Sequence, residues 1–167
     1  MKRLLLILLV VVCLLTTFGC NKNTESFSAP TNFYYRRNSV LFYTVDAVIT
    51  PEIRETVQCN ENILDVVNLY LQGPASNELS SPFPSNLAAL AIVQDEDVIS
   101  IQLNDAIADL SGVTQTIAYS CLFKTLTDLT DCTVVEIQIL SHSGSTVDTL
   151  TLSDENLYFI DSDLKSE

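Results

Sequence analysis

Few side chains in this 167-residue sequence have the type and spacing that catalysis requires. The only histidine is His142, in the segment Ser141-His142-Ser143-Gly144. A Ser–His–Asp triad would use it as the general base, but no Gly-x-Ser-x-Gly turn is present to display a nucleophilic serine. The HExxH, phosphate-loop and GxGxxG patterns are also missing from the sequence. We therefore expect His142 to be a solvated side chain without a catalytic role.

Acidic residues are numerous, but their spacing does not fit a metal site. Asp95-Glu96-Asp97 has the character of an exposed hairpin turn, because a calcium loop needs spaced ligands and a glycine. The acidic segment that begins at Asp154 lacks EF-hand spacing, and no CxxC pair indicates zinc. Paired carboxylates that cleave a glycoside would have to face each other across a cleft, and a compact domain with short loops offers little cleft. The sequence therefore predicts no metal, no cofactor and no enzyme activity.

A cysteine near the N-terminus gives a clearer chemical signal. Lys2 and Arg3 precede the apolar run Leu4–Leu15, whose helical length of ~18 Å is short of the ~30 Å hydrocarbon layer. Residues 1–19 are therefore predicted to be a signal peptide of the lipoprotein type, with an uncleaved signal anchor as the alternative. The segment Thr16-Thr17-Phe18-Gly19-Cys20 resembles a lipobox, in which the Cys20 thiol takes diacylglycerol. Each buried methylene contributes ~0.8 kcal/mol, so acylated Cys20 would hold the protein at the membrane.

Composition and charge describe the chain after the leader. Residues 20–32 are polar and are predicted to be a lipidated tether. Cleavage removes Lys2 and Arg3 and no acid, so the net charge falls by two, from −13 to −15. Nucleic acid needs a basic patch and is therefore not expected as a partner. The negative charge fits solubility, with a basic partner or cation binding as the alternative.

The remaining cysteines leave two alternatives. Cys59, Cys121 and Cys132 are an uneven set for a disulfide framework. Cys121 lies on an apolar helical stripe, which favours a buried free thiol. A bridge between Cys121 and Cys132 is the other interpretation.

Hydrophobic periodicity then places the helices and strands. Ile63, Val66, Val67, Tyr70 and Leu71 form one face of a helix that Asn60 can cap and that Gly73-Pro74 ends. A second helical pattern covers about Thr114 to Leu129. Strand patterns occupy Val40–Val45, Ile53–Gln58, Leu87–Gln94, Val98–Leu103 and Thr133–Leu140, and Thr146–Leu152 is predicted to be an edge strand.

These elements predict an α+β fold. We expect a two-layer sandwich, in which a mixed four- to five-stranded sheet carries two helices on one face. The domain is predicted to cover residues 33–145, and residues 146–167 to hold the edge strand and an acidic C-terminal tail. No internal repeat and no second domain are evident in the sequence.

The order of these pieces resembles the GerMN (sporulation and spore germination) domain over about Val40 to Gly144. The resemblance rests on the first helix followed by Leu71-Gln72-Gly73-Pro74, a loop to Pro84 and two apolar strands, together with Ile53–Val57, Thr125–Leu129 and Val134–Ile139. It implies the same kind of fold, a fold type that builds rings in envelope assemblies, so an oligomer is a further expectation. Ser85-Asn86 after Pro84 and the segment Ser141–Gly144 depart from the family pattern, and these loop differences concern the choice of partner more than the fold.

A candidate docking face follows from the predicted layers. If the helices cover one sheet face, an uncovered polar face with a free edge strand is a natural docking surface, unless it only faces water. The residues assigned to this face are Arg54, Thr56, Ser100, Gln102, Glu136 and Gln138.

The sequence and the resemblance together predict a non-catalytic interaction module tethered to the cell membrane through Cys20. The resemblance implies a role in the envelope of a Gram-positive bacterium, in spore formation or germination, with an envelope protein or the cell wall as partner. The alternative is a small ligand-binding lipoprotein of a transporter or sensor, which would need a pocket that one small domain accommodates poorly.

Overall fold

The computed structural model describes residues 30–38, 48–54 and 62–156. The predictions for the signal peptide, Cys20, the tether, Val40–Val45 and the tail beyond Asn156 lie outside the described residues. The elements in chain order are β1 (Thr31–Arg37), β2 (Ile49–Arg54), α2 (Ile63–Leu71), β3 (Leu79–Ser80), β4 (Ala89–Asp95), β5 (Val98–Asn104), the short 3₁₀ helix η1 (Asp105–Asp109), α3 (Gly112–Thr130), β6 (Val134–Leu140) and β7 (Thr146–Ser153).

The alternating segments build a four-stranded mixed sheet, called sheet B here, with the order β4-β5-β6-β7. The central strands β5 and β6 are parallel, and both outer pairs are antiparallel. Side chains at alternate positions of β5 and β6 are fully or almost fully buried, whereas those between them are partly exposed. Because neighbouring side chains of a strand point to opposite sheet faces, sheet B has one inner and one outer face. The predicted edge strand is β7, which pairs with β6.

The helix α2 presents the predicted apolar face, with Val66, Val67, Tyr70 and Leu71 buried. Its N-cap is Asn62 and not Asn60, because the Asn62 side chain accepts a hydrogen bond from the Leu64 N–H at 3.0 Å. The helix ends as predicted at Gly73, whose φ of 103° lies in the region that glycine tolerates best. Helix α2 packs against β4.

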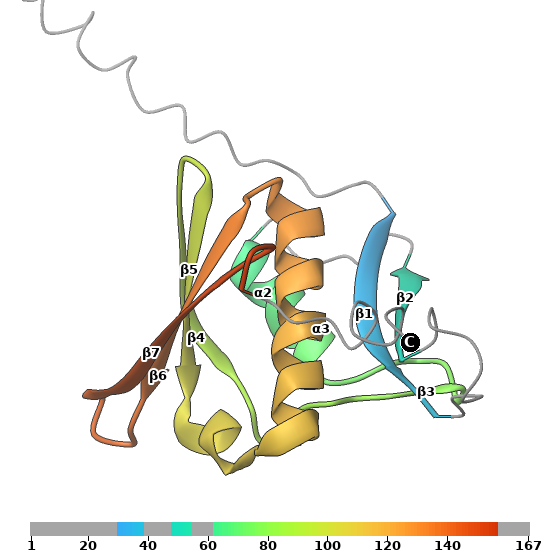
Figure 1. The fold of residues 1–167 in the computed structure, drawn as a ribbon, viewed down its shortest axis with the longest axis horizontal. Coiled ribbons are helices and arrows are strands. Elements are labelled where there is room, and N and C mark those ends of the chain that lie inside the picture. Colours follow the sequence, from blue (N-terminus) through green and yellow to red (C-terminus); the bar gives the residue numbers. More distant parts are fainter. Residues whose placement is uncertain (1–29, 39–47, 55–61, 157–167) are drawn as a thin grey trace, which may run out of the picture.

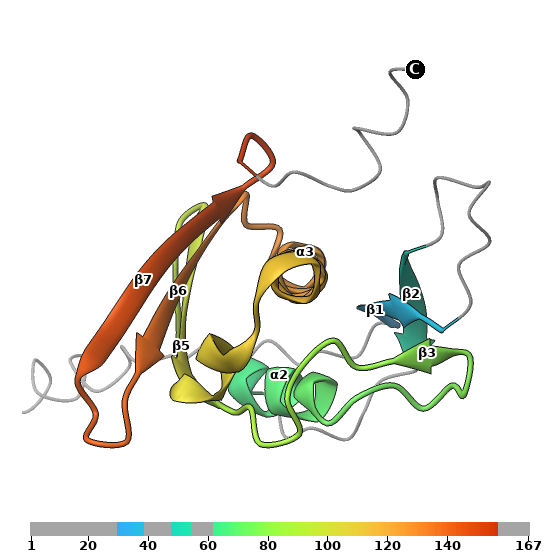
Figure 2. The ribbon, with the colours of Figure 1, turned by 60° about the horizontal axis from the view of Figure 1, so that its bottom comes forward.

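The longer helix α3 lies between sheet B and a second sheet. The stripe of α3 is buried at Ile117, Ala118, Cys121, Leu122, Thr125 and Leu126, whereas Leu129 at its end is only partly buried. Ser120 and Phe123, which lie outside this stripe, are buried as well. Helix α3 packs against β6 of sheet B on one side and against β1 on the other. Figures 1 and 2 show α3 standing between the two sheets. Among the described residues, no helix combines the length and apolarity needed to cross a membrane.

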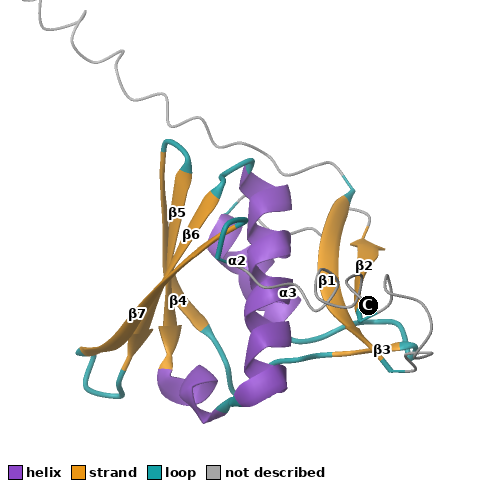
Figure 3. Cartoon of the chain, in the orientation of Figure 1, coloured by secondary structure: helices purple, strands orange, loops and turns teal. Residues whose placement is uncertain are grey.

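The second sheet, called sheet A here, has the order β2-β1-β3 and is antiparallel. Its central strand β1 buries Phe33 and Tyr35 in the core of the domain. The predicted α+β class is therefore confirmed, including a four-stranded mixed sheet with two helices on its inner side. The second sheet makes the domain three-layered, as the colouring in Figure 3 shows, and the predicted strand at Ile53–Gln58 contributes only Ile53 and Arg54 to the described part of β2.

Candidate docking surface

The outer face of sheet B gathers the polar residues that alternation predicted. The parallel register of β5 and β6 places Ser100 beside Glu136 and Gln102 beside Gln138. The Ser100 hydroxyl donates to the Glu136 carboxylate at 3.1 Å, and the Gln102 amide donates to the Gln138 carbonyl oxygen at 3.1 Å. These side chains satisfy one another across the strands, so the centre of the face is already ordered before any partner arrives.

The outer strands extend this face in two rows. In the first row Val93 pairs with Ser100, and Thr151 pairs with Glu136. In the second row Ala91 pairs with Gln102, and Thr149 pairs with Gln138. We use the name outer face for these residues: Ala91, Val93, Ser100, Gln102, Glu136, Gln138, Thr149 and Thr151. Sequence reasoning missed the members on β4 and β7, although Thr149 and Thr151 alternate with the half-buried Leu150 and the buried Leu152.

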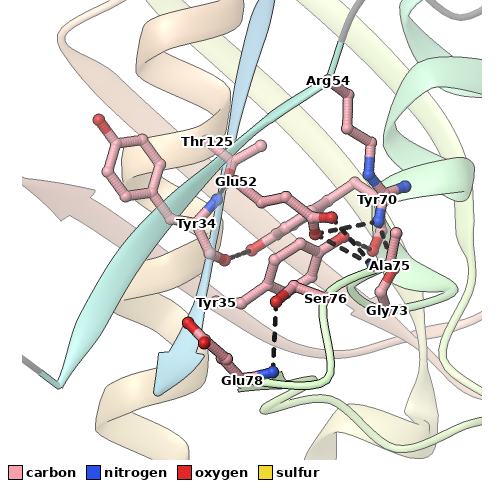
Figure 4. A network of polar contacts seen from close by, with 10 residues as sticks. All are labelled: Tyr34, Tyr35, Glu52, Arg54, Tyr70, Gly73, Ala75, Ser76, Glu78 and Thr125. Carbon is pink, nitrogen blue, oxygen red and sulfur yellow. Dashed lines mark hydrogen bonds and ion pairs between the residues drawn. The ribbon is translucent and has the colours of Figure 1, made fainter.

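Arg54 does not belong to the outer face, contrary to the sequence prediction. It lies on β2 in sheet A, where its guanidinium stacks 5.2 Å from the Phe33 ring centroid and 5.9 Å from that of Tyr35. Its Nη2 donates to the Gly73 carbonyl at 2.7 Å and pairs with Glu52 at 3.3 Å. Figure 4 shows the contacts of Arg54 with Gly73 and Glu52, which join β2 to the end of α2. Thr56, the other β2-region residue assigned to the face, lies outside the described residues.

Tyrosine hydroxyls form a second buried link between α2 and β1. The Tyr70 hydroxyl donates to the Tyr34 carbonyl at 2.8 Å, and the Tyr35 hydroxyl donates to the Tyr70 carbonyl at 2.8 Å (Figure 4). Burial raises the pKa of Tyr70 and of Tyr35 well above its usual value. Burial, followed by the hydrogen bond to Asp128 and its charge, raises the pKa of Tyr34 to about 12. Phenols that stay neutral in this way are suited to holding structure, because they cannot act as bases near neutral pH.

His142 lies in the turn between β6 and β7 and is almost fully exposed, with 96% of its side chain accessible. Its Nδ1 is 3.4 Å from an Asp105 carboxylate oxygen. The neighbouring hydroxyls of Ser141, Ser143 and Ser145 hydrogen-bond to one another at 2.8–3.2 Å. Among the hydrogen bonds of the described residues, none joins a serine hydroxyl to the His142 ring, so a Ser–His–Asp arrangement is not assembled at this turn.

The acidic turn and the cysteines follow the sequence interpretation. Asp95-Glu96-Asp97 is an exposed turn between β4 and β5. In the described ranges, no group of histidine, cysteine or acidic side chains is arranged to hold a metal ion. Cys121 and Cys132 are both buried and unbridged, and burial raises the pKa of Cys121 to about 12. The free-thiol alternative therefore holds for Cys121, whereas Cys59 lies outside the described residues.

These features define a small α+β domain of three layers that displays one mostly uncharged sheet face. The family model "Germane: Sporulation and spore germination" matches residues 32–142. The chain belongs to this family, and the predicted GerMN resemblance is confirmed.

Solved structures give the same fold. The first GerMN domain of the sporulation protein GerM from Bacillus subtilis has a TM-score of 0.55 at 12% identity, covering 77% of this chain and 99% of that one. The tandem GerMN domains of the same protein have a TM-score of 0.51 at 16% identity, covering 81% of this chain and 48% of that one. This chain therefore spans about half the length of the tandem structure. Comparison with the curated proteins finds no matching relative.

Proposed function

We propose that this chain is an extracytoplasmic lipoprotein, anchored through Cys20, whose domain works without catalysis by docking to another component of the cell envelope. Membership of the sporulation and spore germination family supports a role in spore formation or germination in a Gram-positive bacterium. The observation that carries the docking proposal is the outer face of sheet B.

The composition of the outer face supports docking. In a chain of net charge −13, the two rows contain a single charged residue, Glu136, which is hydrogen-bonded to Ser100. Protein interfaces are depleted of charge at their centre, because burying a charge without a partner is costly. Val93 is 63% exposed, so an apolar side chain at the margin also remains available for contact. A pre-ordered, nearly neutral surface loses little side-chain entropy when a partner covers it.

The tether supports docking close to the membrane. Eleven peptide units separate Cys20 from the start of β1 at Thr31. At ~3.6 Å per residue these units reach at most about 40 Å, so a lipid on Cys20 would keep the domain within that distance of the bilayer. Confinement to this layer raises the effective concentration of the domain toward envelope partners.

Replacing outer-face residues with arginine tests the docking role. Ser100→Arg/Gln102→Arg places two long cationic side chains on the two rows of the outer face. We expect chemical cross-linking in cells to capture an envelope partner at least about tenfold less efficiently, because loss of contacts at the centre of an interface has an effect of this size on affinity. Asn77→Arg/Ser85→Arg is the matched control, because it adds the same charge at exposed loop positions off the outer face. Equal capture by both variants, with circular dichroism unchanged, would remove the outer face from the mechanism.

The anchor is tested separately. Labelled palmitate should enter the wild-type protein and be absent from Cys20→Ala, which should leave the membrane fraction. Label that persists in Cys20→Ala would contradict anchoring at this thiol.

A further inference from the structure

The two edge strands of sheet B differ in how their backbone groups are satisfied. Along β7, the Asn156 side chain accepts from the Ser153 N–H at 2.8 Å and donates to the Thr151 carbonyl at 2.9 Å. The Asp148 carboxylate accepts from the Thr149 N–H at 2.8 Å. These groups belong to alternate residues, which turn their backbone to the same side of a strand. The free edge of β7 is thus closed by its own side chains, a common protection against unwanted strand pairing.

The edge of β4 is closed only at its first residue. The Asn68 side chain of α2 accepts from the Ala89 N–H and donates to the Ala89 carbonyl, both at 3.0 Å. Beyond this point, no hydrogen bond from a side chain of the described residues reaches the backbone of Leu90–Asp95. Leu90 is 50% exposed and Val93 63% exposed along the same stretch. β4 therefore combines open backbone groups with apolar side chains, which is what an added strand uses.

Negative charge gathers at one end of this open edge. β4 ends at the exposed Asp95, and the exposed turn Glu96-Asp97 follows it directly. The exposed Asp131 lies beside Cys132, whose thiol donates to the Glu96 carbonyl at 3.7 Å. The Asp97 carbonyl accepts from two backbone N–H groups at the start of β6, at 3.0 and 3.1 Å. The carboxylates are therefore displayed on a turn that is fixed at several points.

No basic side chain of the same part of the chain balances these acids. Between residues 79 and 156 the only lysine or arginine is Lys124. Its ammonium lies 5.7 Å from the Tyr34 ring centroid, beside β1 in sheet A. Charge complementarity therefore points to a cationic partner, and the described residues contain no arrangement that would make it a metal ion.

We infer that the edge Leu90–Asp95 of β4 accepts an extended segment of a protein partner, with lysine or arginine at the end that meets Asp95-Glu96-Asp97. The added strand would continue sheet B and place its alternate side chains next to Val93 on the outer face. This inference rests on the proposed docking function and identifies the chemistry of the partner.

The test uses the full chain in detergent and fluorescent nine-residue peptides of alternating valine and threonine. Two of the peptides carry a pair of lysines, one at its N-terminal end and the other at its C-terminal end. Two matching peptides carry a pair of glutamates at the same positions. We expect one lysine peptide to bind, and the matching glutamate peptide to bind at least about tenfold more weakly. Each exposed ion pair can contribute up to about fivefold in affinity, and the glutamate peptide replaces several such pairs with repulsions. The amides of an extended peptide fall into two alternating sets, which point to opposite edges of the strand. N-methylation of one set should abolish binding and N-methylation of the other should not, because only one edge of the peptide pairs with β4.

Variants locate the site. Val93→Lys should weaken binding of the lysine peptide at least about tenfold. A lysine on an edge strand disfavours strand pairing, and it also repels the cationic end of the peptide. Val147→Lys on β7 is the matched control and should bind as the wild type does. Asp95→Asn/Glu96→Gln/Asp97→Asn should remove the preference for lysine over glutamate.

Three results would overturn the inference: equal binding of the lysine and glutamate peptides, loss of binding in Val147→Lys and not in Val93→Lys, or no binding of any peptide. The proposed function is contradicted by a different result, namely unchanged capture of the envelope partner by Ser100→Arg/Gln102→Arg. Outer-face capture without peptide binding at β4 would therefore reject this inference and leave the docking function standing.

Discussion

Replacing Arg54 with methionine separates a structural role from a docking role for this residue. Methionine keeps much of the apolar stem but removes the guanidinium that links β2 to Gly73 at the end of α2. The side chain is only 17% exposed and its partner Glu52 only 13%, so the lost interactions are largely shielded from water. We therefore expect Arg54→Met to destabilise the domain.

The magnitude follows from the separate contacts. A hydrogen bond from a charged donor, such as that to the Gly73 carbonyl, is worth about 1.5–3 kcal/mol. Stacking on Phe33 and Tyr35 adds about 0.5–1 kcal/mol for each ring. Relief from the cost of desolvating the guanidinium offsets part of this sum, while Glu52 keeps its bonds to the Ala75 N–H at 3.0 and 3.1 Å. We expect the free energy of unfolding to fall by about 2–4 kcal/mol, as these contributions combine.

Urea unfolding followed by circular dichroism measures this change. Arg36→Met is the matched control, because Arg36 is exposed on β1 and its loss should cost less than about 0.5 kcal/mol. The reasoning is refuted if Arg54→Met unfolds at the same urea concentration as the wild type. If Arg54→Met lost partner capture while its stability was unchanged, Arg54 would instead have a role in docking.

Further predictions concern the buried tyrosines and the thiol. Tyr70→Phe should cost about 1–3 kcal/mol, because it leaves the partly buried Tyr34 carbonyl without this donor. Tyr35→Phe should cost less, since the Tyr70 carbonyl keeps the Gly73 N–H at 3.0 Å. An equal or reversed order in urea unfolding would contradict this. The raised pKa values of Tyr34, Tyr35 and Tyr70 favour the folded state fully below pH 10, and this effect is lost as pH rises through the folded values. Stability should therefore be flat to about pH 9 and fall above pH 10, and the phenolate absorbance of these three of the six tyrosines should appear together with unfolding. Ionisation of all six tyrosines in a fully folded protein would argue against it. Cys121, with its pKa raised to about 12, should react with a thiol reagent at the rate of unfolding, and fast labelling in the absence of urea would show that the site opens.

Periodicity was sufficient where one element buries one face. The stripe from Ile63 to Leu71 predicted the buried side of α2, and alternation in Val98–Leu103 and Thr133–Leu140 predicted both faces of the central strands. It also brought Ser100, Gln102, Glu136 and Gln138 to one surface, because parallel neighbours in register share a face.

Sheet A was beyond the reach of the same reasoning. Its third strand is only Leu79–Ser80, too short to show any period, and β1 pairs along its two edges with β2 and β3, which both follow it in the sequence at very different distances. Alternation tells which side of a strand a residue occupies but not which sheet the strand joins, and this is why Arg54 was assigned to the outer face.

The position of α3 between the two sheets also sets how the domain would stand on a membrane. The chain enters at Thr31 in sheet A, and the helix separates that sheet from sheet B (Figure 2). If Cys20 carries a lipid as proposed, the anchor would join the domain on the side of sheet A. The outer face of sheet B would then point away from this attachment, and an envelope partner could bind it without displacing the anchor.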